Sequence, residues 1–218
     1  MAICRSIFIS STVPRRHLPH KIATFHPLPN FSLFTALPLR HRRSLDSFST
    51  LSSSSSMDNP PEGYRRNVGI CLMNPTAKKI FAASRLDMPN AWQMPQGGVD
   101  ENENPRDAAI RELREETGVT SAEIIAEVPH WLTYDFPPHV REKLKQQWGS
   151  DWKGQAQKWF LFKFTGKEEE VNLLGDGTEK AEFGEWSWMS PEQVVDRAVD
   201  FKKPVYEEVM SVFGPFLQ

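Results

Sequence analysis

The stretch from residue 97 to residue 119, GGVDENENPRDAAIRELREETGV, constrains this chain more than any other part of its sequence. It places two glycines ahead of a predicted short helix that carries three glutamates, Glu112, Glu115 and Glu116. Their i, i+3 and i+4 spacing puts the carboxylates on one helix face, where like charges repel by roughly 0.2 to 0.5 kcal/mol per pair. A multivalent cation would remove that repulsion, and oxygen ligands of this kind suit Mg²⁺ or Mn²⁺. The spacing therefore indicates a divalent cation site.

The residues around these glutamates favour a built site over the commoner alternative, a solvated acidic helix face. Asn104 suits the N-cap, and Pro105 suits the first helical position. Gly118 is placed to end the helix in a left-handed cap. An apolar side is provided by Ile110, Leu113 and Val119. We therefore expect a loop, a helix of about three turns and a second turn, with the carboxylates grouped beside the apolar edge.

This pattern resembles the Nudix box, which reads Gly-x5-Glu-x7-Arg-Glu-aliphatic-x-Glu-Glu-x-Gly-aliphatic. The matching positions are Gly97, Glu103, Arg111, Glu112, Leu113, Glu115, Glu116, Gly118 and Val119. The resemblance implies an enzyme that hydrolyses a nucleoside diphosphate linked to another moiety, with divalent metal bound to the helix glutamates. The non-enzymatic alternative is a Nudix-fold module that binds a nucleotide without cleaving it, and the intact set of box glutamates argues against that alternative.

The resemblance also implies roles within the box. The implied metal ligands are the carboxylates of Glu112, Glu115 and Glu116 and the carbonyl of Gly97, and the implied ion is Mg²⁺ or Mn²⁺. Arg111 and Glu103 are expected to form an ion pair that holds the loop against the helix. The bound ion would polarise a phosphoryl oxygen and lower the pKa of a bound water, and a carboxylate not fully used by metal would act as general base.

A further glutamate is expected to join the metal site from outside the box. Glu182 resembles such a residue, so the implied catalytic set is Arg111, Glu112, Glu115, Glu116 and Glu182. Glu185 is the rival, because strict alternation along a strand with Phe183 buried would turn Glu185 inward.

Five segments extend the resemblance to one branch of the family: plant asymmetric diadenosine tetraphosphate hydrolases and bacterial relatives that act on dinucleoside polyphosphates and RNA 5′ ends. These segments are residues 63–69, 92–98, 131–137, 154–160 and 201–202. Arg66 departs from the branch at a position where proline is common. The implied substrates are diadenosine tetra- and pentaphosphate, cleaved to a mononucleotide and a nucleoside polyphosphate. The alternatives are removal of pyrophosphate from RNA 5′ ends and hydrolysis of guanosine tetraphosphate.

The same region supplies candidate substrate-binding side chains. A polyphosphate needs cations beyond the metal ions, and a nucleobase presents a π-face to aromatic rings. The candidates are the cations Arg65, Arg85 and Lys158, the rings of Tyr134 and Phe201, and Gln157 and Lys202 from the matching segments. Trp159 either stacks on a base or packs in the core.

Residues 1–56 differ in composition from the rest of the chain. They contain about a dozen serines, seven of the 26 Lys and Arg residues and one of the 28 acidic residues, Asp46. A basic, serine-rich leader of this kind is typical of an organellar transit peptide, and its serine content favours a chloroplast over a mitochondrion. A disordered tail without an address is the simpler alternative. The expected Nudix domain spans residues 57–218, and a start at Met57 would give a cytosolic form.

Charge and hydropathy limit the partners. Without the leader, 19 basic and 27 acidic residues remain, a net charge of about −8. Such acidity disfavours long nucleic acids and leaves RNA 5′ ends as an alternative. No run approaches the roughly 18 apolar residues of a membrane helix, so we expect no membrane partner. The expected substrate is a small nucleotide.

The remaining pattern predicts an α+β domain. Strands are expected over residues 68–73 and 79–83, joined as a hairpin, and over 122–134, 157–164 and 183–189. Helices are expected after a capping box that begins at Ser190 and over residues 204–213. With no strict βαβ alternation, and with the resemblance above, the expected architecture is the Nudix fold, a mixed β-sheet sandwiched between α-helices.

Overall fold

A long strand, β1 (Tyr64–Asn74), lies at the centre of the sheet in the computed structural model, which describes residues 59–88, 90–178 and 180–218. The predicted leader and the Met57 start lie outside these residues. β1 pairs in parallel with β7 (Gly154–Phe164) and antiparallel with β2 (Lys79–Arg85) and β4 (Gln96–Gly98). The sheet is therefore mixed, as predicted. Within the described ranges no helix is both long and apolar enough to cross a membrane.

Four further strands extend the sheet on both sides of this centre. β3 (Trp92–Gln93) and β8 (Phe183–Met189) pair with β2, while β5 (Ala122–Glu127) and β6 (Leu132–Asp135) pair with β7. The predicted hairpin between β1 and β2 is confirmed. Its turn is closed by Asn74, whose Oδ1 accepts hydrogen bonds from the main chain of Thr76 and Ala77 at 3.0 Å each.

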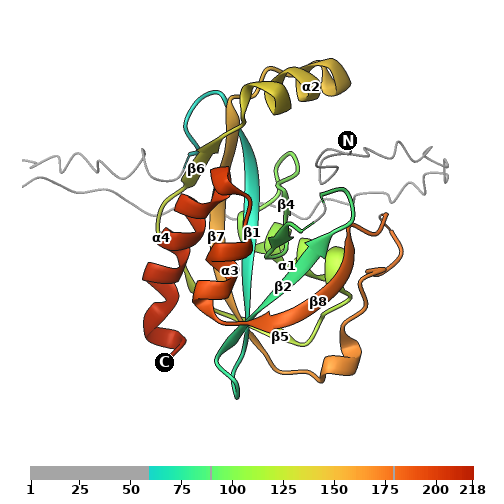
Figure 1. The fold of residues 1–218 in the computed structure, drawn as a ribbon, viewed down its shortest axis with the longest axis vertical. Helices are drawn as coiled ribbons and strands as arrows, with labels where there is room; N and C mark the ends of the chain where they lie inside the picture. The colour runs from blue at the N-terminus through green and yellow to red at the C-terminus, as the bar shows by residue number, and fades with distance from the viewer. Residues whose placement is uncertain (1–58, 89, 179) are drawn as a thin grey trace, which may run out of the picture. The chain divides into compact units, whose positions relative to one another are not determined.

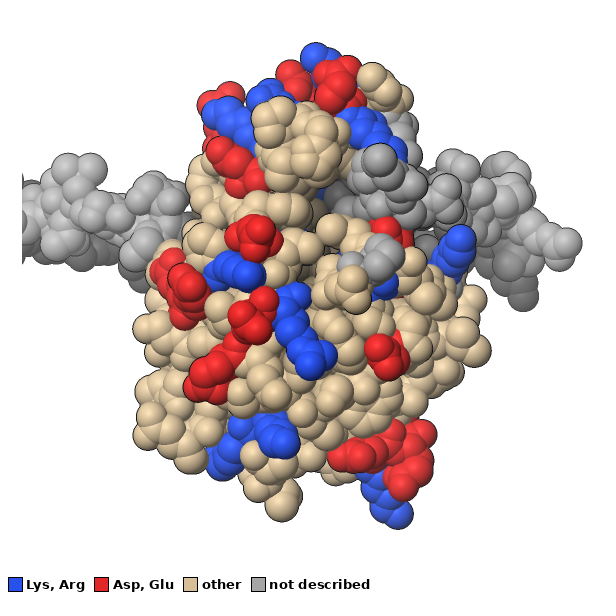
Figure 2. Space-filling model, in the orientation of Figure 1, with Lys and Arg blue, Asp and Glu red and all other residues tan. Residues whose placement is uncertain are grey.

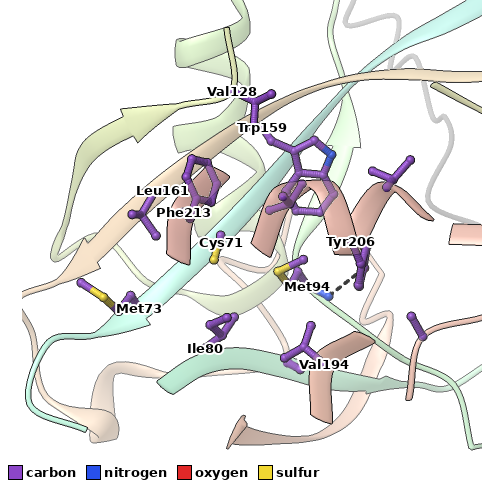
Figure 3. Close-up of a cluster of buried hydrophobic side chains, with 14 of the residues drawn as sticks. Cys71, Met73, Ile80, Met94, Val128, Trp159, Leu161, Val194, Tyr206 and Phe213 are labelled. Atoms are coloured by element: carbon purple, nitrogen blue, oxygen red, sulfur yellow. Dashed lines mark hydrogen bonds between the residues drawn. The ribbon is translucent and has the colours of Figure 1, made fainter. Parts of the chain in front are cut away.

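Helices cover both faces of the sheet (Figure 1). Alternate residues of β1 and β7 point to opposite faces, and both sets are apolar. One set packs against α1 (Pro105–Thr117), which contributes Leu113 to the core. The other packs against α3 (Pro191–Arg197) and α4 (Lys203–Phe213), where Trp159, Leu161 and Tyr206 meet (Figure 3). This layering confirms the expected α/β/α sandwich. Short 3₁₀ turns occupy Glu168–Glu170, Asp200–Lys202 and Gly214–Phe216.

The local signals that predicted α1 and α3 are confirmed. Asn104 caps α1 by accepting a hydrogen bond at Oδ1 from the main chain of Arg106 at 2.8 Å. Gly118 ends the helix at φ 71°, and its N–H donates to the Arg114 carbonyl at 2.8 Å. Ser190 opens α3 with the full capping box. Short-range chemistry is therefore enough to define the boundaries of these helices.

Two expectations about the middle of the chain are wrong. The stretch 122–134 forms two strands, because Pro129 in the interval between β5 and β6 has no N–H to donate to β7. A helix that we did not predict, α2 (Pro138–Trp148), connects β6 to β7. Its signals were present in the sequence: Pro138 in the first turn and Gly149, which ends the helix at φ 67°.

Candidate active site

The candidate metal site lies where β4 meets the glutamate-bearing face of α1. A Cβ at Gly97 would overlap the carboxylate of Glu112, so only glycine lets that carboxylate lie against the main chain of β4. One residue earlier, the N–H of Gln96 donates to Glu116 Oε2 at 2.9 Å. The dipeptide Gln96-Gly97 thus contacts two of the three helix glutamates.

Arg111 holds the loop between β4 and α1 in place. Its guanidinium forms a two-bond ion pair with Glu103 at 2.8 and 2.9 Å and donates to the Gly98 carbonyl at 2.8 Å. The remaining nitrogen, Nη1, donates to Glu112 at 2.8 Å and to Glu115 at 2.9 Å. The expected pair of Arg111 with Glu103 is present, and the same guanidinium also engages two candidate metal ligands.

Burial, together with the charges of neighbouring carboxylates, raises the pKa of two carboxyl groups of the site. Burial, opposed by the neighbouring Arg111 and reinforced by the charges of Glu115 and Glu182, raises the pKa of Glu112 to about 7. Burial and the charges of Glu182 and Glu112 raise the pKa of Glu116 well above its ordinary value. In contrast, hydrogen bonds from Arg111 lower the pKa of Glu103. The charged forms of Glu112 and Glu116 are therefore disfavoured, and a bound cation would stabilise them.

Glu182 lies on this site, and Glu185 does not. The charge of Glu182 is among the causes that raise the pKa of both Glu112 and Glu116, and its Oε2 lies 3.4 Å from Arg85 Nη1. Glu185 is exposed, and its main-chain N–H donates to Ser84 Oγ at 3.1 Å. The alternation argument for Glu185 is wrong because the pairing of β8 with β2 shifts register between Ala83 and Arg85.

The oxygen donors present fit a divalent cation. Glu112 and Glu116 converge on the main chain at Gly97, whose carbonyl could complete a set of hard oxygen ligands. Within the described residues no three acidic, His or Cys side chains are already closed around one point, and both Glu112 and Glu115 accept from Arg111 Nη1. Mg²⁺ is usually held by one or two carboxylates, with waters and substrate phosphates filling the remaining positions. The arrangement therefore matches a site that is completed by a polyphosphate.

Four predicted substrate-binding residues are brought together on the α4 side of the sheet. The rings of Tyr134 and Phe201 lie 5.6 Å apart, and Lys202 Nζ lies 5.6 Å from the centre of the Tyr134 ring. Gln157 reaches the same group through Gln96, to which it donates at 3.3 Å. This cluster of Tyr134, Gln157, Phe201 and Lys202 is called the aromatic-amide cluster below.

Both predicted arginines are buried, and Arg85 lies beside a carboxylate of the site. Arg65 is 8% exposed, and its guanidinium lies over Gly98, where a Cβ would collide with it. Arg85 is 6% exposed and donates to Asp87 at 2.7 Å as well as to Glu182. Arg85 therefore acts on a candidate metal ligand, a contact that the sequence did not suggest.

Lys158 lies away from this cluster, whereas Trp159 lies in the core beside it. Lys158 occupies the opposite face of β7 from Gln157, and its Nζ donates to the Pro129 carbonyl at 3.1 Å and lies over the Trp131 ring. Its role as a further cation for the substrate stays a prediction. Trp159 is fully buried and packs edge-on against Tyr206, so the core alternative is correct for this residue.

Sequence reasoning missed the buried amides around Lys202 and Gln157, one of which, Gln96, also contacts Glu116. Gln93 and Gln96 are 3% and 0% exposed, and both accept hydrogen bonds from Lys202, at 3.2 and 3.0 Å. Asn67, also fully buried, accepts from Gln157 at 2.6 Å. The sequence did contain one signal, the two glutamines Gln93 and Gln96 on either side of Met94-Pro95. Polar side chains that are buried need hydrogen-bond partners, so burial of this short segment would have predicted such a network.

Comparison with known proteins is consistent with this geometry. Residues 63–209 match the model of the NUDIX domain. The chain is 72% identical over 187 residues to Nudix hydrolase 26, chloroplastic, of Arabidopsis thaliana, covering 85% of this chain and 86% of that protein. It is 51% identical over 157 residues to an RNA pyrophosphohydrolase of Cereibacter sphaeroides, covering 71% and 93% of the two chains. The dihydroneopterin triphosphate pyrophosphohydrolase of E. coli superposes with a TM-score of 0.54 at 16% identity, over 66% of this chain and 95% of that one, which shows a shared fold.

Proposed function

Since this chain belongs to the Nudix hydrolase family, we propose that it hydrolyses dinucleoside polyphosphates, with diadenosine tetra- and pentaphosphate as substrates. Membership makes the chain a pyrophosphohydrolase of nucleotide substrates that uses divalent metal ions. The oxygen ligands favour Mg²⁺ or Mn²⁺ as the ion. The chloroplastic relative and the serine-rich leader support a location in the chloroplast.

The proposed reaction uses the carboxylates and the cations of the site together. Glu112, Glu115, Glu116, Glu182 and the Gly97 carbonyl would hold the metal, which supplies a Lewis acid and a water of lowered pKa. Arg111 keeps the loop of the site against α1. A water oxygen bonds to a phosphorus of the substrate's polyphosphate, and the P–O bond that bridges this phosphorus to the next phosphate breaks. The proton of the water passes to a carboxylate of the site. The products are a mononucleotide and a nucleoside polyphosphate.

One observation carries the choice of a nucleotide with a long phosphate chain. The aromatic-amide cluster is joined to the metal carboxylates by a single residue, because Gln96 contacts Glu116 through its main chain and Lys202 through its side chain. Tyr134 and Phe201 offer aromatic faces for a base, and Lys202 offers a cation for phosphate. A substrate that fills both regions must join a base to the cleaved phosphates.

Removal of pyrophosphate from RNA 5′ ends is the second candidate, favoured by the 51% identity to an RNA pyrophosphohydrolase. An RNA chain also needs a surface for its backbone. On the face drawn in Figure 2, acidic and basic side chains of the described residues are interspersed, without a basic stripe of the kind that follows a nucleic acid. We rank the small dinucleotides first because residues 57–218 carry a net charge of about −8, which disfavours a long nucleic acid.

The test is turnover by the full chain with Mg²⁺ or Mn²⁺. The substrates are diadenosine tetraphosphate, diadenosine pentaphosphate, guanosine tetraphosphate, ADP-ribose and 5′-triphosphate RNA, with products separated by chromatography. We expect the diadenosine compounds to be cleaved fastest, and Glu116→Gln to lower their turnover about 100-fold or more. Glu101→Gln is the matched control. Glu101 is exposed in the loop between β4 and α1, so this change should leave turnover unchanged. Faster cleavage of RNA or ADP-ribose would overturn the substrate proposal.

A further inference from the structure

We infer that Gln96 is a positioning residue that couples Lys202 in the aromatic-amide cluster to Glu116 in the metal site. The inference rests on the proposed role of Glu116 as a metal ligand. It adds a specific claim: the grip of Lys202 on the Gln96 side chain keeps the Glu116 carboxylate in its metal-binding position.

Gln96 touches both regions with different atoms. Its main-chain N–H donates to Glu116 Oε2 at 2.9 Å. Its side-chain Oε1 accepts from Lys202 Nζ at 3.0 Å and from Gln157 Nε2 at 3.3 Å. The residue is fully buried, so water does not compete for these bonds. A displacement of the side chain therefore acts on the N–H of the same residue.

Obligate donors fix the direction of this amide network. A lysine ammonium can only donate, so Gln96 must present its carbonyl oxygen to Lys202. The indole N–H of Trp159 can also only donate, and it is bonded to Gln157 Oε1 at 3.2 Å. Gln157 must then use its amide nitrogen toward Gln96 and toward Asn67, whose Oδ1 lies 2.6 Å away. The orientation of the Gln96 side chain thus follows from its neighbours.

The segment that carries Gln96 is otherwise attached through its main chain. Met94 donates its N–H to the Tyr206 hydroxyl at 3.1 Å, the dashed line in Figure 3, and Ile70 donates its N–H to the Pro95 carbonyl at 2.8 Å. These bonds hold the residues before Gln96. At Gln96 itself, the pairing of β4 with β1 and the side-chain bonds together hold the point from which Glu116 and, one residue on, Glu112 are contacted. Groups that hydrogen-bond to metal ligands typically change metal affinity 10- to 100-fold when they are removed.

Gln93 provides a matched control within the same network. It is also a buried glutamine, 3% exposed, and it also accepts from Lys202, at 3.2 Å. Among the described residues, however, Glu116 accepts a hydrogen bond from Gln96 and not from Gln93. Loss of the Gln93 side chain therefore removes the same kind of bond to Lys202 without acting on the metal carboxylate.

The experiment measures Mn²⁺ binding to the full chain by electron paramagnetic resonance, without substrate. We expect Gln96→Met to weaken Mn²⁺ binding about tenfold and Gln93→Met to leave it within about threefold of the wild type. Thermal unfolding of each variant reports its folding. Equal Mn²⁺ affinity in Gln96→Met and wild type, or equal weakening in both glutamine variants, would overturn the coupling.

A second variant approaches the same link from its other end. Loss of the ammonium in Lys202→Met takes a positive charge away from the site, which alone would tighten cation binding. Weaker Mn²⁺ binding in this variant therefore reports lost positioning, and unchanged or tighter binding contradicts it, even where Gln96→Met fails to fold. Glu116→Gln tests the role of Glu116 as a metal ligand separately from the role of Gln96 in positioning it. If Glu116→Gln binds Mn²⁺ like the wild type, Glu116 is not a metal ligand and the proposed function fails as well.

Discussion

At the scale of single residues, Glu182 is the clearest test of the metal site outside the helix. Its charge acts on Glu112 and Glu116, and Arg85 steadies its carboxylate. We expect Glu182→Gln to lower kcat about 10- to 100-fold and to raise the Mn²⁺ concentration needed for half-maximal rate. Glu185→Gln, an exposed change on the following strand, should alter neither quantity. A larger loss of kcat in Glu185→Gln than in Glu182→Gln would reverse the assignment.

At the scale of elements, the segment between β7 and β8 holds Glu182 against the C-terminal end of α1. The N–H of Asn172 donates to the Thr117 carbonyl at 2.8 Å, and Asp176 pairs with Arg114 at 3.0 Å. Gly175, at φ 64°, lies so close to the Glu115 carbonyl that a Cβ there would overlap it. We expect Gly175→Ala to lower the free energy of unfolding by about 2 to 3 kcal/mol and to weaken Mn²⁺ binding, since it adds a clash to backbone strain.

Gly177 separates the clash from the strain. It also has a positive φ, 84°, but a Cβ there would meet no atom within 4 Å. Gly177→Ala should therefore cost only the strain, about 1 kcal/mol, in chemical denaturation, and should leave Mn²⁺ binding unchanged. Equal losses of stability in the two alanine variants would mean that the contact with α1 contributes nothing.

The elements also show which features could be predicted from the sequence. α1 was predictable because its cap, first turn and final glycine are signalled within the helix itself. The position of Lys158 was not, because it depends on which face of β7 turns toward α4, and that face is set by pairing with a strand about 90 residues earlier in the chain. The link through Gln96 was hidden for the same reason: its partners, Glu116, Gln157 and Lys202, come from three distant elements.

At the scale of the whole molecule, the carboxylates of the site link its stability to pH. The pKa of Glu112 is raised from its ordinary 4.5 to about 7 in the folded chain, so the folded state binds this proton more tightly than the unfolded state. Stability therefore falls as pH rises from about 4.5 to about 7, by up to about 3 kcal/mol for this group. Glu116 acts in the same direction. We expect the Tm of the metal-free protein to fall over this window.

The same repulsion predicts how a cation and a substitution change the pH profile. A divalent ion competes with the protons that Glu112 and Glu116 bind, so metal binding should release protons. Mg²⁺ or Mn²⁺ should therefore raise the Tm more at pH 8 than at pH 5. Glu112→Gln keeps the size of the side chain and removes its titration, so the metal-free variant should show a flatter Tm profile between pH 5 and pH 7. A wild-type Tm that rises across this window, or a variant profile as steep as that of the wild type, would show that the pKa of Glu112 is not raised in the folded protein. The residues of the site come from elements between β2 and the turn before α4. The unfavourable free energy of charging these carboxylates therefore lowers the free energy of unfolding of the whole domain, which unfolds cooperatively.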